Sequence, residues 1–155
     1  MVDKTPPILN SISGIDNATP RPGDVISITT SASDNVGVNS VRVFYINEHN
    51  HAQSYGFGSG NGVGSATLQQ NLQSGTYAVD RIEVQDTAFP SNQATYRPDG
   101  SVVFRAADGS TTNATHSFGN FENLHFTVAG SIDLQTPILN SISGIDNATP
   151  RPGDV

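Results

Sequence analysis

The stretch VISITTSASDNVGVNSVRVFYI, residues 25–46, is typical of two β-strands joined by a turn. Apolar and polar residues alternate in its first part, which places Ile26, Ile28 and Thr30 on one face of a strand. Alternation returns in VRVFYI, and the polar, glycine-containing SDNVGVNS between the two runs predicts a turn. The stretch therefore favours β-structure over helix.

Runs of the same kind recur along the chain, while helical periodicity is nearly absent. Threonine, serine, asparagine, glycine and valine are abundant, and these residues favour strands and turns. The further strand candidates are residues 8–15, 66–72, 74–86, 101–106 and 123–130. About seven or eight short strands between turn clusters predict an all-β chain, folded as an antiparallel, immunoglobulin-like β-sandwich.

The longest candidate strand, residues 74–86, changes phase in its middle. Tyr77 and Val79 share one face, whereas the later apolar residue Ile82 falls on the opposite face if the alternation is strict. One extra residue near Asp80 restores the phase, so a β-bulge is predicted there.

The sequence PILNSISGIDNATPRPGDV occurs twice, at residues 7–25 and, unchanged, at residues 137–155. An offset of 130 residues is too long for a solenoid repeat and suits one small domain. We therefore expect residues 1–132 to form one module and residues 133–155 to begin the next copy of a tandem array. The alternative boundary places the domain at about residues 25–155, with the first copy left over. An isolated first strand has an exposed edge, so the tail is expected to pair with a neighbouring molecule or to pack on its parent module.

Composition excludes several classes of function. One period of 130 residues holds a single core. The chain carries 14 Asp and Glu against 7 Lys and Arg, for a net charge of −7, and its single lysine is Lys4. Such a chain neutralises few phosphates, so nucleic-acid binding is not expected. Cysteine is absent, which excludes disulfides. A membrane-spanning helix needs about 18 consecutive apolar residues, and no run in the sequence comes near that length, so membrane insertion is not expected. Any targeting segment is expected outside this sequence.

Four segments stand in a characteristic order: DKTPPILNSIS, RPGDVISITTSASDNVGVNSVRVFY, SGTYAVDRIEVQDTAFPSN and LHFTVAG. Together they resemble bacterial immunoglobulin-like repeats, such as the extender modules of RTX-type and biofilm adhesins, which are long extracellular proteins. The resemblance covers Asp3 to about Ile132. It implies an immunoglobulin-like sandwich located at the bacterial cell surface or outside the cell, with a tyrosine corner at Tyr77. Residues 95–122 depart from the pattern and predict an inserted hairpin.

Three aspartates are expected to meet at one pole of such a sandwich. The start of the first strand, the loop after the second and the loop after the sixth carry Asp3, Asp34 and Asp86. Carboxylates gathered there repel one another unless a cation lies between them, and calcium prefers oxygen ligands on flexible loops. We therefore predict a Ca2+ site with these three ligands at the junction between modules. Asp133 takes the place of Asp3 in the next module.

Asn35 and Asn92 offer amide oxygens beside these carboxylates, and bound calcium would stiffen the joint between modules in place of disulfides. The alternative is that the aspartates are ordinary turn residues, since Asp hydrogen-bonds its own backbone in turns. No D-x-D-x-D-G calcium loop occurs to decide between the two. Asp80 and Glu83, which fall on a candidate strand, are expected to be solvated.

Two further segments carry weaker signals. His49 and His51 share one face of a candidate strand, with Glu48 beside them, and imidazoles at this spacing bind zinc or copper when other ligands join them. The alternative is an exposed polar hairpin. The glycine-rich GFGSGNGVG, residues 56–64, lacks the pattern of a phosphate-binding loop and predicts a flexible hairpin tip.

These features predict a structural role. No G-x-S-x-G or other catalytic pattern occurs, so an enzyme is not expected. We expect a spacer module, repeated in tandem in a large bacterial surface or secreted adhesin, whose partners are the neighbouring repeats of the same chain. The alternative is a binding module that contacts carbohydrate or a cell surface through residues 49–64 or 97–121. Identity between the copies favours the spacer, because a spacer needs copies and a ligand site does not.

Overall fold

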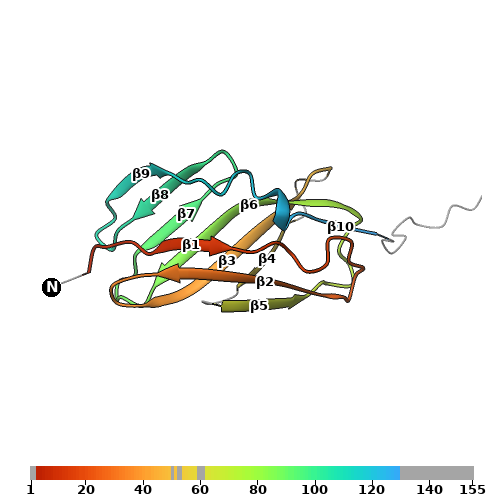
Figure 1. Cartoon of the computed structure of the whole chain (residues 1–155), viewed down its shortest axis with the longest axis horizontal. Coiled ribbons are helices and arrows are strands. Elements are labelled where there is room, and N and C mark those ends of the chain that lie inside the picture. The colour runs from red at the N-terminus through yellow and green to blue at the C-terminus, as the bar shows by residue number, and fades with distance from the viewer. Residues whose placement is uncertain (1–2, 50, 52–53, 59–61, 130–155) are drawn as a thin grey trace, which may run out of the picture.

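The computed structural model describes residues 3–49, 51, 54–58 and 62–129 (Figure 1). This part of the chain forms ten strands and one short 3-10 helix, η1. In chain order they are β1 (Ile8–Ile12), β2 (Val25–Ser33), β3 (Val38–Asn47), β4 (Ser54–Gly58), β5 (Gly62–Thr67), β6 (Gly75–Asp86), β7 (Gln93–Tyr96), β8 (Ser101–Arg105), β9 (Thr111–Thr115), η1 (Glu122–Leu124) and β10 (Phe126–Val128).

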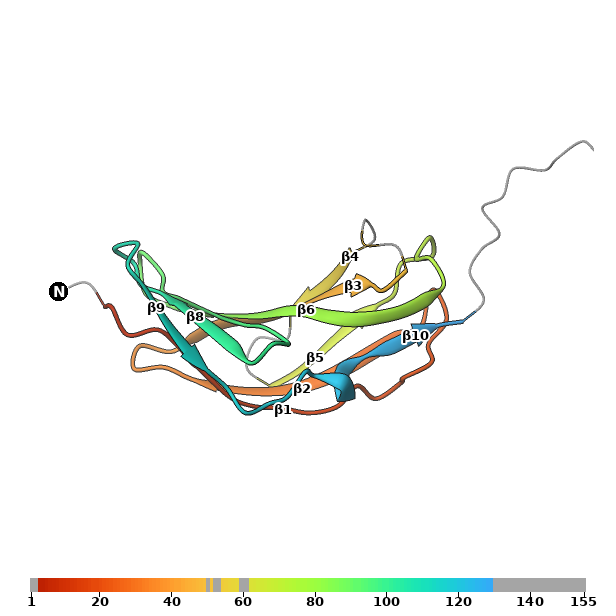
Figure 2. The same cartoon turned by 90° about the horizontal axis from the view of Figure 1, so that it is seen from above.

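Two antiparallel sheets form the sandwich. One sheet has the order β1-β2-β5, and the other has the order β4-β3-β6-β7-β8-β9, with β10 also paired to β6. Figure 2 shows the two sheets as facing layers. β10 pairs with the beginning of β6 and β7 pairs with its end, so they occupy one edge of β6 in succession. The order β1-β2-β5 against β4-β3-β6-β10 is that of an immunoglobulin-like sandwich, with β7 to β9 added.

The core lies between the sheets, as the alternation in residues 25–46 predicts. Ile26, Ile28 and Thr30 of β2 are buried, and so are the alternate residues of β3. Phe126 stacks on Tyr77 at a ring-centroid distance of 5.1 Å and meets Tyr45 edge-on at 5.0 Å. The apolar residues buried in the core are Leu9, Ile26, Ile28, Ala32, Val41, Val43, Tyr45, Leu68, Leu72, Tyr77, Val79, Ile82, Val84, Ala94, Tyr96, Val102, Phe121, Leu124, Phe126 and Val128.

The predicted bulge in β6 is confirmed. Phe44 pairs with Arg81 and the next residue, Tyr45, pairs with Val79, so Asp80 has no partner across β3. This extra residue keeps apolar residues on both sides of it buried. The side chains of Asp80 and Glu83, which were expected to be solvated, are partly exposed, and both pair with Arg81, which donates to Asp80 at 2.6 Å and to Glu83 at 2.7 Å.

The predicted tyrosine corner is also present. The Tyr77 hydroxyl donates a 3.1 Å hydrogen bond to the carbonyl of Gln73, four residues upstream. This bond ties the loop that enters β6 to the strand itself.

Two predictions on the middle of the chain are wrong. The strand expected at residues 66–72 lies earlier, at β5, and Leu68 and Leu72 are buried from a loop. The glycine-rich segment is not a hairpin tip, because β4 pairs with β3 in one sheet and β5 pairs with β2 in the other. Glycines carry no side chain to alternate, so strands formed through backbone pairing leave no periodic signal. His49 and His51 lie in the loop between β3 and β4, not on a strand, and both are exposed.

The insertion is larger than the predicted single hairpin. β7, β8 and β9 form two successive hairpins that extend the larger sheet beyond β6. Ala94, Tyr96 and Val102 on these strands are buried, so the extension adds to the core. The buried Tyr96 hydroxyl accepts a 2.8 Å hydrogen bond from the backbone N–H of Leu9. The insertion therefore supports β1, the first strand of the opposite sheet.

The two ends of the described sandwich lie at opposite poles of its long axis. Figure 1 places the beginning of the described chain at one end and β10 at the other. We call the first end, formed by the segment before β1, the β2–β3 loop and the β6–β7 loop, the N-terminal pole. The second copy of the repeat, residues 133–155 with Asp133, lies outside the described residues, so the domain boundary and the pairing of the tail stay predictions.

Candidate metal centre

The three aspartates singled out from the sequence come together at the N-terminal pole. Asp3 precedes β1, Asp34 directly follows β2, and Asp86 is the last residue of β6. One carboxylate oxygen from each residue lies within 4.8 Å of those of the other two. Three segments that are far apart in the chain thus place three acidic groups within reach of a single cation. Among the described residues, this is the one group of three or more acidic, histidine or cysteine side chains so arranged.

Asp86 is the buried member of the triad, with an exposed fraction of 1%. Its Oδ1 accepts hydrogen bonds from the backbone N–H groups of Asn92, at 2.8 Å, and Ala88, at 3.2 Å. Its Oδ2 accepts a 2.6 Å bond from the Asn92 side chain. A buried carboxylate is costly unless donors surround it, and the β6–β7 loop supplies all three of these donors.

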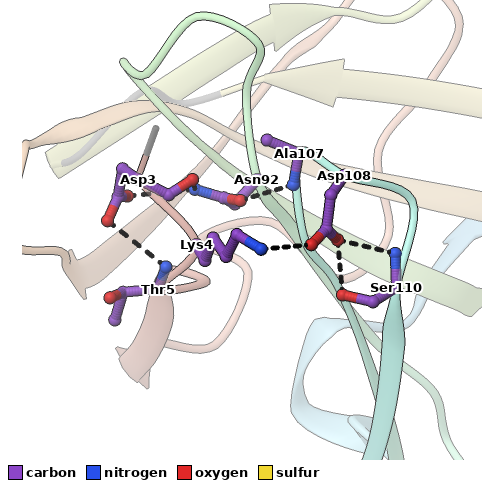
Figure 3. Close-up of polar contacts among 7 residues, drawn as sticks. All are labelled: Asp3, Lys4, Thr5, Asn92, Ala107, Asp108 and Ser110. Atoms are coloured by element: carbon purple, nitrogen blue, oxygen red, sulfur yellow. Dashed lines mark hydrogen bonds and ion pairs between the residues drawn. The ribbon is translucent and has the colours of Figure 1, made fainter. Parts of the chain in front are cut away.

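Asn92 is the organising amide of the site, and it is fully buried. Besides Asp86, its Nδ2 reaches Asp3 Oδ2 at 3.0 Å (Figure 3). Its Oδ1 accepts a 2.7 Å hydrogen bond from the backbone N–H of Ala107. One side chain therefore joins two members of the triad to the insertion.

The expectation that Asn35 and Asn92 present amide oxygens to the site is wrong. Asn35 donates through Nδ2 to Asp3 Oδ1 at 3.0 Å, and Asn92 also turns its nitrogen toward the carboxylates. The physical reason is that ionised carboxylates are acceptors only, so the amide hydrogens are their natural partners. The carboxylates themselves are left as the oxygen ligands of the site.

The pKa of Asp3 is lowered from its ordinary value of 3.8. The main cause is the hydrogen bond from Asn35, and the backbone N–H of Thr5 adds to it, while partial burial opposes the change. Asp3 is therefore anionic at neutral pH, as a cation ligand has to be.

Asp34 has one oxygen without a donor. Its Oδ1 accepts a 2.9 Å hydrogen bond from the backbone N–H of Val36, in an Asp turn of the kind that the alternative interpretation expects. Its Oδ2 is buried and has no hydrogen-bond partner within the described part of the chain. Buried acceptors are nearly always satisfied, so this oxygen is available to a cation or to a water molecule.

The insertion reaches the site through the turn between β8 and β9. Lys4, next to Asp3, forms a 2.7 Å ion pair with Asp108 of that turn (Figure 3). Asp108 also accepts hydrogen bonds from the backbone N–H and the hydroxyl of Ser110. The bond from Lys4, followed by those from Ser110, holds the pKa of Asp108 well below its usual range, and Asp108 raises the pKa of Lys4.

Sequence reasoning missed the contributions of Lys4, Ala107 and Asp108. The one local signal was the Asp108–Gly109 pair, a dipeptide typical of tight hairpin turns. That signal locates a turn, but it does not say that the turn packs against residues about a hundred positions earlier.

Comparison of the chain with protein-family models, with curated proteins and with solved structures gave no match. Within the described residues, no helix has the length and apolar character needed to cross a membrane.

Proposed function

We propose that residues 1–132 form a structural spacer module of a large, repetitive bacterial surface or secreted adhesin, with calcium stiffening the joint between modules. The observation that carries this proposal is the convergence of Asp3, Asp34 and Asp86 within 4.8 Å at the N-terminal pole. In a tandem array this pole faces the preceding module, because the module ends at the opposite pole (Figure 1).

Calcium is the cation that fits this donor set best. It takes about six to eight oxygen ligands, from carboxylates, backbone carbonyls and water, in adaptable geometry. The site offers three carboxylates, and the orphan Oδ2 of Asp34 gains a partner when a cation binds. Zinc would favour histidine or cysteine ligands, which this group lacks.

An ion bound here adds a second bridge between segments that the side chain of Asn92 already connects. Asp3 belongs to the segment that connects each module to the one before it, whereas Asp86 is anchored in the longest strand of the sandwich. Bridging the two restrains the connecting segment against the body of its own module. Asp133 repeats Asp3 at the start of the next copy, so the first of the three ligands recurs at the following junction. The excess of acidic over basic residues, 14 against 7 in the chain, keeps neighbouring modules apart in solution.

A thermal melt of the chain in saturating calcium and in chelator tests this function. A ligand that binds only the folded state at a hundredfold excess over Kd stabilises it by about 2.7 kcal/mol. For a domain of this size the midpoint should rise by roughly 10 °C. Equal melting midpoints in calcium and in chelator would mean that the three aspartates are ordinary turn residues and bind no calcium. Magnesium at the same concentration is the control, since it tolerates this irregular geometry poorly.

A ligand-binding module acting through residues 49–64 or 97–121 is the second candidate. The observation that favours it is β9, whose five residues are all exposed and whose outer edge has no strand partner among the described residues. Such an edge accepts an added strand. Binding of the chain to a protein on a cell surface that persists in chelator, and is lost when residues Thr111–Thr115 are replaced, would favour this candidate.

A further inference from the structure

The N-terminal pole also carries an apolar tip. Phe89, in the β6–β7 loop, has an exposed fraction of 99%, and its neighbour Pro90 is exposed as well. Val36, in the β2–β3 loop, has an exposed fraction of 46%. Of the large apolar side chains in the described residues, Phe89 is the most exposed. Phe89, Pro90 and Val36 together expose apolar surface that adds nothing to the core of their own module, and such a group of side chains is available to a partner outside that module.

The tip is held firmly in place. Thr87 donates through its backbone N–H to Gly37, at 2.9 Å, and through its hydroxyl to the carbonyl of Val36, at 2.8 Å, which locks the two loops together. The Asp86 carboxylate accepts from the backbone of both Ala88 and Asn92 and so closes the loop that presents Phe89. Because Asp86 also belongs to the acidic triad, the apolar tip and the candidate calcium site share one rigid support.

We infer that Phe89, with Pro90 and Val36, is the surface on which the preceding module of the array docks. This inference rests on the proposed spacer function. The partner follows from chain length: only residues 129–132 separate the end of β10 from Asp133, which repeats Asp3. The five steps from Val128 to Asp133 span at most about 18 Å. The far pole of one module is therefore held close to the N-terminal pole of the next, where the tip lies.

The neighbourhood of the tip has room for side chains of that partner. Phe89 and Pro90 line a shallow cavity of about 500 Å³, together with Asn39, Gln85 and Ser91. An apolar contact here would act with calcium: the ion restrains the connecting segment, and the contact fixes the angle between the modules. Together they would keep the array extended.

The test uses a property of the sequence, which contains no tryptophan. Phe89→Trp makes the fluorescence emission report on this one position. In a protein made of residues 1–155 alone, the tryptophan should emit as a solvent-exposed residue and should be quenched freely by acrylamide. In a protein of two complete periods with the substitution only in the second, the emission should shift to the blue and acrylamide quenching should fall several-fold.

Equal emission and quenching in the two proteins would overturn the inference. A blue shift in the shorter chain that grows with concentration would also overturn it, because the partner would then be a separate molecule. Val63→Trp is the matched control, since Val63 is 70% exposed on β5 and should give the same signal in both proteins. Repeating the measurement in calcium and chelator, beside the thermal melt, separates the two proposals. If the tryptophan is protected in the longer protein but calcium does not raise the melting midpoint, the contact between modules is supported and the calcium site is rejected. If calcium raises the midpoint but the tryptophan stays exposed, the calcium site is supported and the contact is rejected.

Discussion

The side-chain amide of Asn92 donates a 2.6 Å hydrogen bond to the carboxylate of Asp86, and both groups are buried at the N-terminal pole. The same amide bonds Asp3 and accepts from the backbone of Ala107, so one residue connects the start of the module, the end of β6 and the insertion. The candidate calcium site thus depends on a residue that is not itself one of its carboxylate ligands.

Asn92→Ala should destabilise the module strongly. The substitution leaves the buried Asp86 carboxylate without its side-chain donor and the N–H of Ala107 without its acceptor, a loss of about 2–5 kcal/mol. Urea denaturation in chelator measures it directly. Asn113→Ala, on the exposed strand β9, is the matched control and should change the free energy of unfolding by less than about 0.5 kcal/mol. A loss at Asn92 no larger than that at Asn113 would show that the network contributes little.

Asp34→Asn should abolish the calcium response without harming the fold. Asparagine keeps the Oδ1 acceptor for Val36 and removes one of three neighbouring negative charges, so the midpoint in chelator should stay the same or rise. In calcium the rise of the wild-type midpoint should be lost. Asp99→Asn, in the β7–β8 turn, is the control and should keep the full calcium response. If Asp34→Asn retained that response, Asp34 would not be a ligand.

Tyr96→Phe should cost more stability than Tyr77→Phe. Loss of the Tyr96 hydroxyl leaves the N–H of Leu9 buried without a partner, at a cost of about 1–3 kcal/mol. The Tyr77 hydroxyl bonds a carbonyl in a partly buried setting, and its loss should cost about 0.5–1.5 kcal/mol. Urea denaturation of both variants, with unchanged m-values, gives the comparison. The reverse order would mean that the insertion supports β1 by apolar packing alone.

Alkaline solution should weaken the fold through Tyr96. Burial, opposed in part by the bond from Leu9, raises the pKa of Tyr96 above its ordinary value of 10.0. As the pH rises past that value, the unfolded chain releases the phenolic proton while the folded chain retains it, so stability falls. Melting points between neutral pH and strongly alkaline pH should therefore decline less for Tyr96→Phe than for the wild type. Parallel declines would assign the effect to other groups.

Acid should destabilise the module partly through the Lys4–Asp108 ion pair. The pKa values of Asp3 and Asp108 are lowered in the folded chain, so the stability that they provide is present above their ordinary value of 3.8 and is lost as the pH falls through the folded values. Lys4→Met removes the largest cause of the change at Asp108, and its melting point should fall less steeply below pH 4. Arg21→Met is the control, since Arg21 is exposed and lies beside the end of β10 at the other pole, and it should follow the wild-type curve.

The sequence by itself determined the sandwich and the place of its acidic pole. Alternation of side chains is local information: it marks Ile26 and Ile28 as buried, and a break in its phase marks the bulge at Asp80. Strand order then predicts where Asp3, Asp34 and Asp86 lie, because the ends of strands in a sandwich meet at its poles.

Only the tertiary structure decided which groups surround those carboxylates and how the insertion is used. Lys4 pairs with Asp108, 104 residues further along the chain. Asn92 directs its side-chain nitrogen to the carboxylates, while its side-chain oxygen accepts a hydrogen bond from the backbone N–H of Ala107. The glycine-rich segment likewise divides between two sheets, through backbone pairing that leaves no periodic pattern. Side-chain periodicity is a local property that can be read from the sequence. Hydrogen bonds between distant segments form only when the sheets have packed and their loops lie side by side, so the sequence does not reveal them.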